Sequence, residues 1–160
     1  KAINEYGITH IHFDIMGQGD QEQPLKKLAK KLDIEDHVSF HGFVDDETRL
    51  TLLQRSHLHF QLAPKEGWGI TVVEAASQKV PTICFDVPGL RDSVKPSTGY
   101  IVQDEEKLTE TFVQSLGDIA SKNTTYLDKQ KRAREWASRF SWKNILPQWR
   151  TLIDETISSE

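Results

Sequence analysis

The sequence predicts an α/β fold in which a doubly wound parallel sheet is followed by extra helices. Two observations predict it. Short apolar runs alternate with amphipathic stretches of helical period, and from Glu105 onward only the helical pattern remains. A length of 160 residues with 37% hydrophobic content is enough for one sizeable core. We therefore expect a single domain over residues 1–160, with covering helices from about 104 to 158.

The apolar runs have the length of strands. Four are strong and a weaker one follows, in the order Ile11–Met16, Val38–Phe40, Leu58–Leu62, Val80–Phe85 and Tyr100–Val102. Because helical stretches separate them, neighbouring strands should run parallel and be joined by right-handed crossovers.

The stretches between these runs have helical periodicity. Pro24–Leu32 carries leucines at i, i+3 and i+7, and Asp46–Arg55 places two leucines on one face. Asp20 and Asp45 precede the two stretches and are candidate N-caps.

The N-terminal end predicts that the domain is truncated there. Ala2, Ile3 and Tyr6 have the pattern of the last turns of a helix closed by Gly7, yet the sequence has nothing that starts this helix. We expect the first strand of the sheet, and part of the helix after it, to precede residue 1.

Charge and cysteine content restrict the function classes. The net charge is −4 and the basic residues are scattered, which disfavours nucleic acid as a partner. The single cysteine, Cys84, lies in an apolar run, so we expect a buried thiol. No stretch has the pattern of a leader or a membrane span. We expect a cytoplasmic setting, with membrane association only through other segments, as in peripheral attachment to the inner face of the membrane.

Ligands of open parallel sheets bind beyond the carboxyl ends of the strands. Four loops occupy these places: Gly17–Asp20, Gly42–Val44, Pro64–Gly69 and Asp86–Gly89. The third is the most informative, because Glu66 and Glu74 flank Gly67 and Gly69, and helical periodicity begins at Ile70. A helix N-terminus preceded by glycines suits a phosphate, and a carboxylate can accept hydrogen bonds from the hydroxyls of a sugar.

Structural interpretations of the same residues stay open. Glu74 could serve only the helix dipole, and Glu66 could be a solvated loop carboxylate. Trp68 could pack on its own loop, and Gly17-Gln18-Gly19 could be plain turn chemistry. The histidines are paired at strand spacing without further ligands nearby, so we expect no metal site. A P-loop, a complete G-x-G-x-x-G and a G-x-S-x-G elbow are all missing, which disfavours kinases, dinucleotide enzymes and hydrolases.

Five segments in order resemble one known family. IMGQGD, VSFHGFV, HLHFQLAPKEGWGITVVEAAS, VPTICFDVPGLRDSV and TGYIV are similar to the C-terminal, donor-binding domain of the retaining group 1 (family 4) glycosyltransferases. These enzymes have two Rossmann-like domains, an arrangement called GT-B. The family's hallmark is two glutamates separated by seven residues, which Glu66 and Glu74 match. The resemblance runs from about Ile11 to Val102, with a weaker echo at Phe140-Ser141-Trp142.

The resemblance implies a role for each matching residue. Glu74 would accept hydrogen bonds from the ribose hydroxyls of a nucleotide, and Glu66, as the catalytic residue, would hold hydroxyls of the donor sugar. The sugar and the diphosphate would be faced by five consecutive residues: Gly67, Trp68, Gly69, Ile70 and Thr71. Gly17 and Gly19 would line the nucleotide pocket, and Phe43 and Val44 would lie against the base.

The resemblance also implies a reaction. The donor would be a UDP- or GDP-sugar, from which a hexosyl unit passes with retention, and without a metal or other cofactor, to a hydroxyl of a glycan, lipid or small molecule. The acceptor would be held by an N-terminal domain outside this sequence, so this domain alone should be inactive. A catalytically inactive nucleotide-binding or scaffold module of flavodoxin-like topology is the alternative.

Two features depart from the family. Lys79 stands where members usually have glycine, so we expect the helix to close there without the usual residue for positive φ. The family's phosphate-binding arginine and lysine would precede Lys1, so we expect the main cationic clamp to lie upstream.

Overall fold

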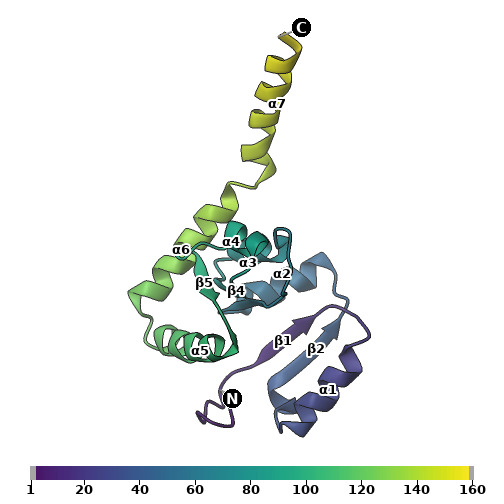
Figure 1. Cartoon of the computed structure of the whole chain (residues 1–160), viewed down its shortest axis with the longest axis vertical. Helices are drawn as coiled ribbons and strands as arrows, with labels where there is room; N and C mark the ends of the chain where they lie inside the picture. Colours follow the sequence, from purple (N-terminus) through teal and green to yellow (C-terminus); the bar gives the residue numbers. More distant parts are fainter. Residues whose placement is uncertain (1–2, 159–160) are drawn as a thin grey trace. The chain divides into compact units, whose positions relative to one another are not determined.

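The computed structural model of the chain describes residues 3–158, which divide into two compact units at the junction of Arg55 and Ser56. Figure 1 shows unit 1 in purple to blue and unit 2 in teal to yellow. The single domain expected over residues 1–160 stays a prediction.

Unit 1 contains two parallel strands. Its elements in order are β1 (Phe13–Met16), α1 (Glu22–Lys31), the 3-10 helix η1 (Glu35–His37), β2 (Val38–Gly42) and α2 (Asp46–Arg55). Strands β1 and β2 pair with Phe13 opposite Val38, and the register shifts between Ile15 and Met16. Both strands and both helices lie where the sequence predicted them.

The two candidate N-caps of unit 1 have different outcomes. Asp45 caps α2, because its carboxylate accepts from the backbone N–H of Thr48 at 2.7 Å. The N-cap position of α1 is Gln21 rather than Asp20, and within the described residues no side chain caps this helix. The expectation for Asp20 is therefore wrong, since α1 begins two residues beyond it.

Unit 2 contains three parallel strands in the order β3-β4-β5. Its elements are β3 (His59–Gln61), α3 (Ile70–Ser77), β4 (Thr82–Phe85), α4 (Pro88–Ser93), β5 (Gly99–Val102), α5 (Glu105–Ala120), α6 (Thr124–Ser138) and α7 (Trp142–Ser158). Val72 of α3 packs with Cys84 of β4 and Leu90 and Val94 around α4. One turn after Val72, α3 packs on α6 through small residues: Ala76, Ala133 and Ala137.

Helix α4 is the element that the sequence pattern missed. The sequence pattern predicts a loop at Asp86–Gly89, but a helix of six residues begins at Pro88. Val87 before it has extended backbone, as a residue preceding proline should, and proline suits the first position of a helix. In the sequence, Pro88 was the signal that a helix could begin there.

Residues at the N-terminus form a turn rather than the end of a helix. The N–H of Gly7 donates to the carbonyl of Ile3 at 3.0 Å, and Gly7 has a φ of 65°. Gly7 therefore closes a turn over residues 3–6, and Ala2, which the sequence prediction also included, lies outside the described residues.

The C-terminal helices occupy the range that the sequence predicted. Helix α7, described over its whole length, has no buried residue, and it exposes large apolar side chains that include Trp142, Leu146 and Trp149. Of the helices in residues 3–158, none is both long enough and apolar enough to cross a membrane.

Cys84 is fully buried, and burial, together with the nearby charge of Asp86, raises the pKa of its thiol to about 11. The prediction of a buried thiol is confirmed.

Candidate functional site

The loop between β3 and α3 folds around the carboxylate of Glu66. Its Oε2 accepts from the side-chain amide of Gln61 at 3.0 Å, and its Oε1 accepts from the backbone N–H groups of Gly67 at 3.0 Å and Trp68 at 3.4 Å. A carboxylate offers about four lone-pair positions, and these bonds use three of them. Oε2, with one donor, is the oxygen that keeps room for a hydroxyl.

These hydrogen bonds hold Glu66 in its charged form. The N–H of Trp68 lowers the pKa of Glu66 the most, although its nitrogen lies farther from the carboxylate than that of Gly67. Burial acts in the opposite direction, and the donors at Gly67, Gln61 and Gly69 add to the lowering. The charged carboxylate is thus a preformed acceptor.

Helix α3 begins directly after this loop. Gly69 is its N-cap with a φ of 81°, a conformation that suits glycine, and a Cβ there would lie 3.0 Å from the side chain of Leu90. Since glycine has no capping side chain, the first N–H groups of α3 suit an external anion. Ile70, which is 71% exposed, and the exposed Thr71 stand at this end.

Glu74 lies one turn further along α3 and is half-buried. Val72 and Ala76 face the core, so the i and i+4 positions Ile70 and Glu74 share the face of the helix that points away from it. Two of the predicted site residues, Ile70 and Glu74, therefore lie on the same face of α3.

Gly89, the second residue of α4, packs against the backbone of the loop between β3 and α3. A Cβ on Gly89 would lie 2.0 Å from the carbonyl oxygen of Glu66 and 2.5 Å from the carbonyl carbon of Gly67. Only glycine allows this approach. Gly67 differs, because it is exposed and a Cβ there would meet nothing within 4 Å. The sequence pattern did not predict this role of Gly89, although the residue belongs to the fourth of the four loops that follow the predicted strands.

Trp68 has a packing partner. Its ring meets that of Phe140 edge to face, with centroids 5.3 Å apart and an interplanar angle of 72°. The packing alternative for Trp68 is thus supported, and its contact with a donor stays a prediction.

The remaining predicted residues belong to unit 1. The N–H of Gly17, after β1, donates to the carbonyl of Gly42, at the end of β2, at 2.7 Å. This bond joins the turn of Gly17 and Gly19 to that of Phe43 and Val44, and Phe43 is 77% exposed. These residues are brought together in unit 1, and their joining with the Glu66 loop into one site stays a prediction.

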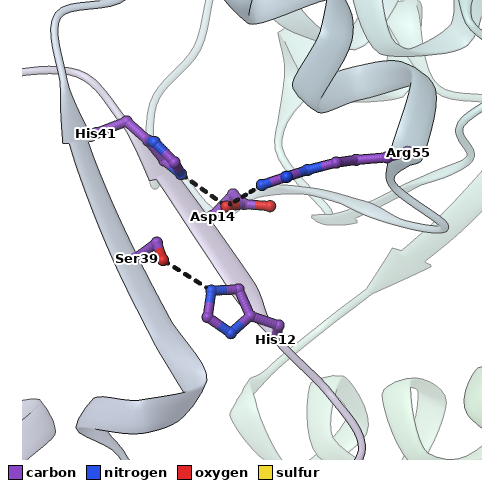
Figure 2. A network of polar contacts seen from close by, with 5 residues as sticks. All are labelled: His12, Asp14, Ser39, His41 and Arg55. Atoms are coloured by element: carbon purple, nitrogen blue, oxygen red, sulfur yellow. Dashed lines mark hydrogen bonds and ion pairs between the residues drawn. The ribbon is translucent and has the colours of Figure 1, made fainter.

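A polar network that the sequence analysis did not predict links the strands of unit 1 (Figure 2). His41 and Arg55 donate to Asp14 at 2.6 and 2.9 Å, and His12 pairs with Ser39 at 2.9 Å. Burial would raise the pKa of Asp14, but the bonds from His41 and Arg55 outweigh it and lower the pKa. The network ties β1 to β2 and to the end of α2.

Within residues 3–158 no three His, Cys, Asp or Glu side chains are grouped so that they could hold a metal ion. The expectation of a reaction without metal or cofactor stays a prediction.

The fold and the position of the glutamate loop define the class of the protein: a Rossmann-like α/β domain corresponding to the C-terminal half of a GT-B glycosyltransferase. The family described as glycosyl transferases group 1 matches residues 2–136. The chain belongs to this family.

Relatives and solved structures agree with this family. A protein from Haemophilus influenzae named as an uncharacterized glycosyltransferase is 27% identical over 141 residues, covering 87% of this chain and 39% of the relative. The UDP-N-acetylglucosamine–peptide N-acetylglucosaminyltransferase GtfA subunit of Streptococcus parasanguinis is 24% identical, covering 98% of this chain and 32% of the relative. The crystal structure of pneumococcal O-GlcNAc transferase GtfA with UDP and GlcNAc has a TM-score of 0.75 at 22% identity, covering 91% of this chain and 29% of the other. The chain thus spans well under half the length of each.

Proposed function

We propose that this chain is the donor-binding domain of a retaining hexosyltransferase that uses a nucleoside-diphosphate sugar. The observation that carries the proposal is the preformed loop and helix N-terminus from Glu66 to Glu74. Two similar proteins support a nucleotide-sugar donor. One is named a UDP-N-acetylglucosamine–peptide N-acetylglucosaminyltransferase GtfA subunit, and the other is the pneumococcal GtfA solved with UDP and GlcNAc.

The barrier in such a reaction lies largely in charge separation as the glycosidic bond breaks. The N-terminus of α3 would stabilise the negative charge that develops on the leaving diphosphate, because its N–H groups are already oriented. The cationic side chains expected upstream would supply the remaining charge, and no metal would be needed. The acceptor would be bound by a further domain, so we expect no transfer by this chain alone.

The two glutamates would have different tasks. Glu74 would accept from the ribose hydroxyls, and Glu66 would hold a hydroxyl of the sugar through Oε2, the oxygen with one donor. Both bind and position the donor, so the rule that relates carboxylate separation to stereochemistry in glycoside hydrolases does not apply to them.

The proposal predicts how affinity responds to loss of the charge of Glu74. We expect Glu74→Gln to weaken binding of the preferred nucleoside diphosphate, among UDP, GDP and ADP, by about tenfold or more, since a hydrogen bond to a charged group contributes about 1.5–3 kcal/mol. Calorimetric titration of this chain measures it. In the intact enzyme, Glu66→Ala should lower kcat.

Glu105→Gln is the control, because Glu105 is a helical glutamate near the start of α5, outside the predicted site. It should leave nucleotide affinity unchanged. An inactive scaffold would show no saturable preference for any nucleotide, and unchanged kcat/KM in the Glu66 and Glu74 variants would refute the assignment.

A further inference from the structure

We propose that Phe140 is a positioning residue for the sugar-binding glutamate, acting through Trp68. The proposal rests on the proposed function for the role of Glu66. Its own basis is a set of contacts that joins the Glu66 loop to the end of α6 and to α4, all within unit 2.

The contacts form a closed path. The ring of Phe140 packs edge to face on Trp68, and also on Trp136 with centroids 5.2 Å apart and an interplanar angle of 81°. The indole N–H of Trp136 donates to the carbonyl of Ser93, the last residue of α4, at 2.9 Å. The first turn of α4 then returns to the loop through Gly89, which lies against the backbone of Glu66. The loop is held between these two supports.

Trp68 makes the connection to the carboxylate. Its ring is held by Phe140 while its backbone N–H donates to Oε1 of Glu66. If the ring loses its partner, the peptide that carries this donor is no longer fixed, and Oε1 loses one of its backbone donors. The direction of the carboxylate therefore depends on the aromatic contact.

The exposure of Phe140 argues that its ring does more than fill a core. The side chain is 37% exposed and lies just beyond the last residue of α6, where its N–H donates to Ala137 at 3.1 Å. Truncating a partly exposed ring removes less apolar burial than truncating a core ring. Its loss should affect the loop more than it affects the stability of the fold.

The N-terminus of α3 should be less sensitive to this change. Gly69 is buried and packs near Leu90 and Val72, which belong to the core of unit 2. A diphosphate bound at this N-terminus would therefore keep its donors when Phe140 is changed. Loss of the ring should weaken contacts to the sugar and spare those to the nucleotide.

The experiment compares Phe140→Ala with Phe112→Ala. Phe112 of α5 is a matched control, because its ring packs on Phe60 of β3 with the same centroid distance of 5.3 Å and interplanar angle of 72° as the ring pair of Phe140 and Trp68. Carbon-13 NMR of this chain first gives the pKa of Glu66 without any ligand. We expect Phe140→Ala to raise the pKa of Glu66 toward its ordinary value, Phe140→Leu to raise it less, and Phe112→Ala to leave it unchanged.

Calorimetry then separates the sugar from the nucleotide. The probes are UDP, GDP and ADP and their glucose and N-acetylglucosamine conjugates. For the best-bound nucleotide, Phe140→Ala should change affinity by less than about twofold, while affinity for the conjugate should fall about tenfold. Phe112→Ala should leave the ratio of the two affinities unchanged.

An unchanged pKa of Glu66 in Phe140→Ala would overturn the proposal, whether or not nucleotides bind. Equal losses of affinity for the nucleotide and for its sugar conjugate in Phe140→Ala would also overturn it. So would the same change in the ratio of these two affinities in Phe112→Ala. If the wild-type chain bound no nucleotide while Phe140→Ala still raised the pKa of Glu66, the positioning of the loop would stand and the proposed function would fail.

Discussion

At the scale of single residues, burial fixes the protonation state of His59. This residue lies in β3 and shares a hydrogen bond with Thr82 of β4 at 3.1 Å. The residue as a whole is half-buried, and desolvation lowers its pKa from 6.5 to about 4. The folded chain therefore carries His59 in its neutral form at neutral pH.

Because the folded-state pKa of His59 is depressed, we expect the chain to lose stability as the pH falls. Between about pH 6.5 and about pH 4 the unfolded state binds a proton that the folded state does not, so the stability present above pH 6.5 is lost progressively in this window. The partial exposure reduces the effect to about 1–3 kcal/mol. Urea unfolding at pH 7 and pH 4.5 measures it. His59→Gln should lose less stability than the wild type over the same range, and an equal loss in both proteins would contradict the assignment.

At the scale of elements, three helices end in the same way without glycine. After α3 the N–H of Val80 donates to the carbonyl of Ala75 and that of Lys79 to Ala76, both at 3.0 Å, which is the Schellman pattern. The residue that must be left-handed is Lys79, with a φ of 64°. Helices α1 and α5 close with the same pair of bonds, and their left-handed residues are Asp33 and Lys122, with φ of 55° and 49°.

The expectation that this helix closes without the usual glycine is therefore confirmed, and Lys79 itself takes the positive φ. The two backbone hydrogen bonds satisfy carbonyls at the end of α3 and favour the left-handed conformation, although a Cβ makes that conformation costly. Sequence pattern could predict α3 from its apolar period. It could not predict this ending, because glycine is the usual signal for it.

Replacing Lys79 with glycine should stabilise the chain. Glycine removes the steric cost of the left-handed conformation, and its larger freedom in the unfolded state offsets part of the gain, so we expect an increase of about 1 kcal/mol in the free energy of unfolding. Lys79→Ala keeps the Cβ and is the control, which should show little or no gain. Denaturant unfolding at pH 7 compares the three proteins. Equal stability of the glycine and alanine variants would show that the conformation carries no cost.

The candidate site was predictable to the extent that it follows from spacing. The glycines and glutamates of the third loop identified the start of α3 and the carboxylate beside it. The supports of the loop were not predictable, because Gly89 and Phe140 are 22 and 73 residues from Gly67 along the chain and meet the loop only through tertiary packing. Periodicity describes single elements, and it has no information on such contacts.

At the scale of the whole molecule, the buried apolar residues are unevenly distributed. Among residues 3–55 the buried hydrophobic side chains are Ala29, Leu52 and Leu53, while leucines of α1 such as Leu25 and Leu28 remain 41% and 47% exposed. Unit 2 holds the larger set, including Val72, Val80, Ile83, Cys84, Leu90 and Val94, each at 2% exposure or less. Burial of apolar surface is the main stabilising contribution, so the units should differ in local stability.

This difference predicts the order of hydrogen exchange. The first three residues of β4 are buried. The free energy of the opening that exposes the amides of β1 and β2 should therefore be at least about 2 kcal/mol lower than that of the opening that exposes β4. Native-state exchange followed by NMR measures both sets. Asp14→Ala removes the acceptor shared by His41 and Arg55, and it should lower protection in β1 and β2 by about 1–3 kcal/mol while leaving β4 unchanged. If β4 loses the same protection, the chain opens as one cooperative domain, as its length and composition first predicted, and the uneven core does not set local stability.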